Sequence, residues 1–238
     1  SLSQPAADWI GADAGNATIG ELLTRAWEGE EGMPAIWEVR YGGPPLVSGV
    51  ERFTSRGPSY ALLERLLNRV TGQPAGEVFR DRLFTPVGLT RTVWDDGLLN
   101  DSLVCRGYTG PYGSTVVVTG LVGPLADLWH WHQVLNAGAV LPAGARERMF
   151  TPSDNGYGLG WVVGRTAGGA PVIEHASDQP GFQLWSGYFP NRDVLVLLAV
   201  NNDLGLRRQV ADRLTELLVD SAPSLTGGVT KADRVGGD

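Results

Sequence analysis

The hydrophobic positions in the first 150 residues recur mainly at helical spacing. Five apolar residues between positions 62 and 70 share one face of a predicted helix, and Gly72 stands where that helix should end. Thr18 and Glu21, three residues apart, form the capping-box pattern that starts another helix. Further helices are predicted at residues 75–83, ending before Pro86, and at 125–135 and 143–149.

After Pro152 the period changes from helical to extended. Four short segments rich in valine and aromatic residues predict strands, at 157–163, 171–175, 182–189 and 193–200. Turn-forming residues at 190–193 join the last two as a hairpin, and a closing helix is predicted at 206–219.

This order of elements predicts an α+β fold, with helices first, then antiparallel strands, then a terminal helix. We expect one domain over residues 1–220, with a helical lobe at about 1–152 and the sheet and last helix at about 153–220. Residues 221–238 are predicted to form a flexible tail. A cleft is expected where the lobe and the sheet meet.

The composition excludes several classes of function. A net charge of −7 without a basic stripe argues against nucleic-acid binding. The single cysteine, Cys105, excludes an intramolecular disulfide and a cysteine-based zinc site. His130 and His132 point to different sides of a helix, so we interpret them as ordinary surface or boundary residues and expect no metal or cofactor. No apolar run is long enough for a membrane span.

Several segments, taken in order, resemble the serine β-lactamase-like and penicillin-binding-protein-like family. That family includes class C-type β-lactamases, DD-peptidases, D-aminopeptidases and related esterases. The resemblance covers nearly all of residues 1–202 and implies an antiparallel sheet flanked by helices. The segments that carry it are TIGELLT at 18–24, the stretch 53–63, VTG at 70–72, FTPVGLTRT at 84–92, ADL at 126–128, GYGLGW at 156–161 and EHASDQPGF at 174–182.

The nucleophile and base that the family provides as Ser-x-x-Lys are absent from this sequence. Eighteen arginines accompany one lysine, Lys231, and Gly228 stands three residues before it. Residues 2–5, LSQP, resemble the stretch that follows the nucleophile helix in the family. The resemblance therefore implies that an N-terminal segment with the nucleophile helix and the first strands is missing. We expect either a separate N-terminal fragment of the same polypeptide that pairs with this chain, or a chain that is itself a fragment, with one side of its sheet left open.

The family's second motif, Tyr-x-Asn, aligns with residues 55–57. The resemblance implies that Ser55 relays a proton and that Gly57, which has no side chain, stands where an asparagine would hold a substrate amide. Alternatively, Ser55 is a capping or loop serine ahead of the helix that follows.

The third motif, Lys-Thr-Gly or His-x-Gly, aligns with residues 175–177. The resemblance implies that His175 assists protonation or binds a substrate carboxylate, although a structural histidine at a strand end is the alternative. Ser177 replaces a glycine that permits close backbone approach. The backbone N–H of Asp178 would be the second oxyanion donor, and its carboxylate would repel an oxyanion if it pointed into the site.

Two further sets of residues are candidates for a functional role. Ser1 could act as an N-terminal nucleophile through its own amine, but it aligns with an ordinary loop of the family. Tryptophans could line an apolar pocket, although core packing is the more usual role of such rings. These tryptophans are Trp129, Trp131, Trp161 and Trp185.

We therefore expect part of a serine hydrolase that acts on amide or ester bonds of a small-molecule or peptide substrate. The alternative is a catalytically silent relative, a pseudoenzyme with a binding or non-hydrolytic biosynthetic role. A purely structural interaction module is the third hypothesis. The resemblance implies a secreted or periplasmic location, and the disulfide-free sequence is equally compatible with the cytoplasm.

Overall fold

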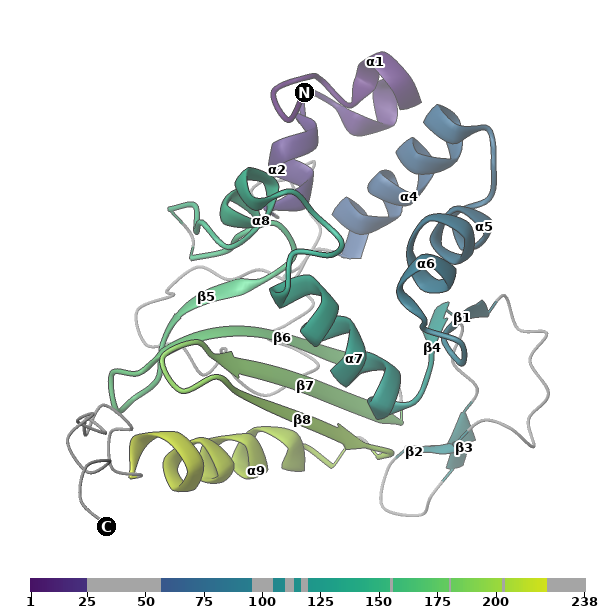
Figure 1. Ribbon diagram of the computed structural model, residues 1–238. Helices are drawn as coiled ribbons and strands as arrows, with labels where there is room; N and C mark the ends of the chain where they lie inside the picture. The colour runs from purple at the N-terminus through teal and green to yellow at the C-terminus, as the bar shows by residue number, and fades with distance from the viewer. Residues whose placement is uncertain are drawn as a thin grey trace, which may run out of the picture.

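The computed structural model describes residues 1–24, 57–95, 105–109, 114–116, 120–154, 156–179, 181–202 and 204–221. Its main sheet has four antiparallel strands in the order β5-β6-β7-β8 (Figure 1). The strands are β5 (Val162–Arg165), β6 (Pro171–Gln179), β7 (Phe182–Phe189) and β8 (Val194–Val200). The predicted α+β fold is thus confirmed, and the tail predicted at 221–238 lies outside the described residues apart from Ser221.

Two of the predicted strands have different bounds in the structure. The strand expected at 171–175 continues to Gln179, pairing with β7 along its whole second half. The strand expected at 157–163 begins only at Val162, because Gly156 (φ +75°) and Gly160 (φ +90°) turn the preceding residues out of the extended conformation. The residues of the GYGLGW segment therefore form a loop that leads into β5.

One face of the sheet packs against the helix α9 (Leu206–Thr215), which continues as a π-helical turn at Glu216–Asp220. Side chains alternate between the two faces of a strand, so residues 172, 174, 176 and 178 of β6 face α9. The main hydrophobic core lies in this layer. Its buried residues are Tyr157, Val162, Val172, Trp185, Phe189, Val196, Ala211 and Val219.

The helical elements form a second group with a small core of their own. The helix predicted from the leucine spacing is α4 (Gly57–Thr71), and Gly72 follows it with φ +69°. The capping box at the start of α2 is confirmed, because Thr18 Oγ1 accepts from Glu21 N and Glu21 Oε2 accepts from Thr18 N. The other helices are α1 (Ala7–Ile10), α2 (Ile19–Leu23), α5 (Ala75–Phe79) and α6 (Thr85–Val87), and the buried residues of the core are Ala6, Ala14, Ala17, Leu22 and Leu62.

The helical run predicted to end before Pro86 continues past it. A π-helical turn at Arg80–Phe84 links α5 to α6, and Pro86 lies in the first turn of α6. The first turn of a helix needs no backbone N–H for its internal hydrogen bonds, so a proline is tolerated there. Gly88, in the left-handed conformation with φ +78°, ends the run.

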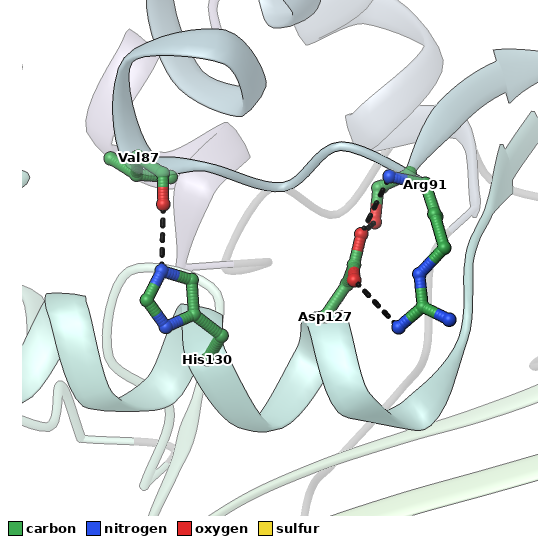
Figure 2. Close-up of polar contacts among 5 residues, drawn as sticks. Val87, Arg91, Asp127 and His130 are labelled. Carbon is green, nitrogen blue, oxygen red and sulfur yellow. Dashed lines mark hydrogen bonds and ion pairs between the residues drawn. The ribbon is translucent and has the colours of Figure 1, made fainter.

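Side chains of helix α7 (Leu125–Asn136) form hydrogen bonds with the end of α6 and the segment that follows it. The carboxylate of Asp127 accepts hydrogen bonds from Arg91 N at 3.0 Å and Thr92 Oγ1 at 3.0 Å, and His130 Nε2 donates to the Val87 carbonyl at 2.8 Å (Figure 2). Asp127 and His130 are three residues apart, so their side chains lie on one side of α7. After α7 comes α8 (Ala143–Met149), which precedes the loop into β5.

Two small two-stranded sheets lie outside the main sheet. They are β1 (Val93–Asp95) with β4 (Gly120–Val122), and β2 (Gly107–Thr109) with β3 (Ser114–Val116). β2 contacts the end of β8, since Tyr108 N donates to the Asn201 carbonyl at 3.0 Å. Gly107 is packed so tightly against the β6–β7 turn that an added Cβ would lie 2.8 Å from the Gly181 carbonyl oxygen.

Candidate functional site

His175 lies on β6, half-buried on the face of the sheet opposite to α9. Its Nδ1 is 2.8 Å from the carbonyl oxygen of Gly160. A carbonyl only accepts, so Nδ1 carries the proton and donates it. In a neutral ring Nε2 is then the acceptor nitrogen. This hydrogen bond joins β6 to the loop that precedes β5.

That loop, residues 156–161, is fixed by backbone hydrogen bonds to itself and to the end of α8. Gly158 N donates to the Trp161 carbonyl at 2.7 Å, and Leu159 N donates to the Met149 carbonyl at 2.9 Å. On its other side the loop passes close to the first turn of α4, because a Cβ added to Gly160 would lie 3.3 Å from Tyr60 Oη. Gly160 therefore lies between His175 and the start of α4.

The side chain of Trp161 is the centre of an aromatic group next to His175. Its ring contacts His175 edge-on with centroids 6.1 Å apart, His132 at 5.2 Å and Phe150 at 5.9 Å. His132 is buried, and this burial lowers its pKa to about 4, so the ring is neutral at pH 7. Its Nε2 has no hydrogen-bond partner among the described residues.

Ser177 and Asp178 follow His175 on β6 and point to opposite faces of the sheet. Ser177 shares the face of His175, whereas the buried carboxylate of Asp178 lies on the α9 side. There it accepts from Arg207 at 2.7 and 3.0 Å and from Gln183 Nε2 at 3.2 Å. Burial raises the pKa of Asp178, and the Arg207 guanidinium opposes this rise. The carboxylate is therefore turned away from the face that carries His175.

The backbone of β6 has an edge beside these residues. In the part of the chain that the structure describes, β5 pairs with β6 only from Pro171 to Glu174. Residues 175–179 pair with β7 on their other side alone. The outward N–H and C=O groups of this stretch are thus not used by the β5 ladder and can meet an extended ligand or an oxyanion.

The remaining sequence candidates fall in different places. Ser55 lies outside the described residues, and Gly57 is the first residue of α4, one turn or less from Tyr60. Ser1 lies in an exposed turn, where its amine donates to Gln4 Oε1 at 2.6 Å. Gly57, the last residue of the second motif, is thus also the first residue of α4. The structure brings the strand of His175 close to this first turn of α4.

Some single-residue predictions were wrong and some were confirmed. Core packing is confirmed for Trp185, which is 1% exposed, but not for Trp129, which is 50% exposed on α7. His130 and His132 do point to different sides, towards Val87 and Trp161 respectively. The surface or boundary role given to His132 is wrong, because residues from the β5 loop cover that side of α7.

Sequence reasoning missed the part played by Arg207 and Gly160. The sequence pattern did not single out Arg207, although its place in the first turn of a helix after the last strand puts it next to the sheet. The carbonyl of Gly160 has no sequence signal as a hydrogen-bond acceptor. The glycine itself was visible in the GYGLGW segment.

The described residues contain neither a metal-binding cluster nor a membrane-spanning helix. No group of three His, Cys, Asp or Glu residues gathers there closely enough to hold a metal ion. Likewise, none of the helices in the described ranges is long and apolar enough to cross a membrane.

Comparisons with known proteins agree with this fold. The family model described as Beta-lactamase matches residues 1–220. The Bacillus subtilis (strain 168) protein PbpX, which bears a penicillin-binding-protein name, is 25% identical over 175 residues, covering 67% of this chain and 43% of its own length. The chain thus spans less than half of that relative.

Solved structures with the same fold include two of different kinds. The octameric penicillin-binding protein homologue from Pyrococcus abyssi is 18% identical with a TM-score of 0.67, over 92% of this chain and 60% of its own. The D-amino acid amidase from Ochrobactrum anthropi SV3 is also 18% identical, with a TM-score of 0.70, over 91% of this chain and 78% of its own. At this identity the likeness is one of fold.

Proposed function

Because the chain belongs to the β-lactamase family, we propose that it is part of a serine hydrolase that cleaves amide or ester bonds through an acyl-enzyme. The nucleophile and its base would come from an N-terminal segment of the same polypeptide, because this sequence contains no Ser-x-x-Lys. The substrate would be a small molecule or a peptide. The amidase and penicillin-binding-protein names of the relatives support this reaction class.

The position of His175 is the observation that carries this proposal. Its ring lies on the open part of β6, bound to the Gly160 carbonyl at 2.8 Å, and Gly160 in turn lies next to the first turn of α4. A side chain that can donate or accept a proton therefore stands where two motif-bearing segments approach each other. This arrangement suits proton transfer or the binding of a substrate carboxylate.

The other candidate residues take roles consistent with that arrangement. Ser55, ahead of α4, would relay a proton, and Gly57 would leave space where a larger side chain would contact substrate. The Asp178 N–H would donate to the developing oxyanion. Its carboxylate does not oppose this role, since it is bound to Arg207 on the other face. Ser177 would line the approach to the strand edge.

The far edge of β8 supports the participation of a further segment. β8 is the last strand of the described sheet, and its sequence, VLVLLAV, is apolar throughout. A long apolar edge strand is a template for pairing, and native proteins cover or pair such edges. A strand from an N-terminal segment would pair there, and a following helix would bring its serine and lysine towards His175.

Covalent labelling tests the proposal. We expect no adduct when this chain alone is treated with a fluorophosphonate or β-lactam probe and its intact mass is measured. A polypeptide in which the upstream coding sequence is joined to this chain should give one adduct per molecule. A Ser→Ala variant at the upstream nucleophile is the matched control and should give none. An upstream sequence without Ser-x-x-Lys would contradict the proposal.

A catalytically silent relative is the second candidate. Gly57 and Ser177, at positions where the family pattern has an asparagine and a glycine, favour it. In that case the cleft would bind a ligand without acylation. A folded, complete polypeptide that takes up no probe at all would support this second candidate against the hydrolase.

A further inference from the structure

We propose that Trp161 is a positioning residue for His175. Its ring and the carbonyl of the preceding residue, Gly160, hold the imidazole in the Nδ1–H form, so that Nε2 is the nitrogen that exchanges a proton with substrate. This inference rests on the proposed function for the role of His175, but its structural part can be tested on this chain without any activity.

The first step is the hydrogen bond to Gly160. The Nδ1–O distance of 2.8 Å is that of a well-formed N–H···O bond, and the acceptor is a backbone carbonyl that cannot donate. Imidazole in water has no such preference for a proton on Nδ1. In the neutral ring, the loop therefore selects a tautomer that the free side chain would not favour.

The second step is the conformation that aims the carbonyl. Gly160 has φ +90°, a region that residues with a Cβ rarely adopt. A Cβ added there would also lie 3.3 Å from Tyr60 Oη. Both facts make glycine the residue that can present its carbonyl to His175 at this point, close to α4.

The third step is the immobilisation of Trp161. The rings of His132, Phe150 and His175 each contact it edge-on, at interplanar angles of 72°, 65° and 74°. Such packing restricts the rotation of an indole. Because Trp161 directly follows Gly160, a fixed indole also fixes the peptide plane that carries the accepting carbonyl. Trp161 thus fixes the orientation of the His175 ring in two ways, through direct contact and through the position of the Gly160 carbonyl.

The chain offers a clean measurement, since it contains three histidines. Two-dimensional NMR of ¹⁵N-labelled imidazoles distinguishes a protonated, pyrrole-like nitrogen from an unprotonated, pyridine-like one. We expect neutral His175 to show a pyrrole-like Nδ1 and a pyridine-like Nε2. The signals of His175 are identified as those that the variant His175→Gln loses. A wild-type His175 with its proton on Nε2 would overturn the proposal.

Variants then test the role of Trp161. We expect Trp161→Leu to lose the pyrrole-like Nδ1 signal in favour of a mixture dominated by the Nε2–H form, and Trp161→Phe to retain part of it. Trp129→Leu, which removes an exposed indole from α7, is the matched control and should leave His175 unchanged. A Trp161→Leu spectrum identical to that of the wild type would contradict the proposal.

A second pair of variants covers the case in which Trp161→Leu fails to fold. Gly160→Ala should shift the tautomer, whereas Gly169→Ala should not. Gly169 has a similar φ of +86°, and a Cβ there meets nothing within 4 Å. An unchanged tautomer in folded Gly160→Ala would count against the proposal. Failure of the hydrolase proposal would appear separately, as a complete polypeptide that no probe labels while His175 keeps its Nδ1–H form.

Discussion

The carboxylate of Asp178 forms a two-point ion pair with the guanidinium of Arg207, at 2.7 and 3.0 Å. The two side chains are 1% and 13% exposed, so the pair links β6 to α9 inside the protein. Removing one partner of such a pair leaves an uncompensated buried charge. We expect Arg207→Met to lower the free energy of unfolding by about 3–5 kcal/mol at pH 7, measured by urea denaturation.

The pH dependence of this loss follows from the pKa of Asp178. Burial already raises this pKa in the folded protein, and removing Arg207 raises it further. At pH values between the ordinary pKa of an aspartate in the unfolded chain and the raised pKa of Asp178 in the folded variant, the native state binds more protons than the unfolded state. The stability of the variant therefore falls as pH rises through this range. The deficit of Arg207→Met should therefore shrink in acid. Arg208→Met, which removes an exposed i,i+4 pair with Asp212, should cost about 0.5 kcal/mol or less at any pH.

Strand β6 shows which parts of this site could be predicted from the sequence. The sequence pattern predicted a strand that ends at His175, and the family resemblance placed Ser177 and Asp178 directly after it. In the structure the strand continues to Gln179 and includes all three residues. The partner of Asp178 was not predictable, because Arg207 is 29 residues away and its neighbour Arg208 carries the same sequence signal. Only the register of α9 over the sheet decides which arginine reaches the carboxylate.

Elsewhere in the fold, features that depend on residues close together in the sequence were predicted correctly, whereas a feature that depends on distant contacts was not. The capping box at Thr18 and the end of α4 at Gly72 depend on residues a few positions apart, and both were predicted correctly. The start of β5 was not, because valine, tyrosine and tryptophan at 157–163 suit a strand, while Gly156 and Gly160 adopt positive φ values that break it. The contact of that loop with α4 and α8 decides its conformation.

Asp127 provides the next prediction, which concerns the attachment of α7 to the segment after α6. Its carboxylate accepts from Arg91 N and Thr92 Oγ1, both at 3.0 Å (Figure 2). Asp127→Ala should cost about 1–3 kcal/mol of unfolding free energy, because two donors lose a partly buried acceptor. Asp81→Ala, at an exposed pair with Arg80, is the control and should cost about 0.5 kcal/mol or less. Equal losses in the two variants would contradict this interpretation.

Gly158 and Gly144 make a matched pair that tests the packing of the loop before β5. A Cβ at Gly158 would clash with the Met149 carbonyl oxygen, a backbone atom, whereas one at Gly144 would meet nothing within 4 Å. Gly158→Ala should therefore destabilise the protein by about 1–3 kcal/mol. Gly144→Ala, in the first turn of α8, should raise stability by up to about 1 kcal/mol. Thermal unfolding measures both, and a neutral Gly158→Ala would show that the loop can move away.

His132 gives a prediction for the whole aromatic group around Trp161. Burial lowers the pKa of this ring to about 4, against about 6.5 in an unfolded chain. Between these values the unfolded state binds more protons, so stability should rise with pH through this window and be lost progressively below pH 6.5, by about 3 kcal/mol in total. His132→Leu should abolish this part of the pH dependence, while His130→Gln should preserve it. Parallel stability curves for the wild type and His132→Leu between pH 4 and 7 would mean that water reaches the ring, and that Trp161 does not pack against it as tightly as 5.2 Å between centroids implies.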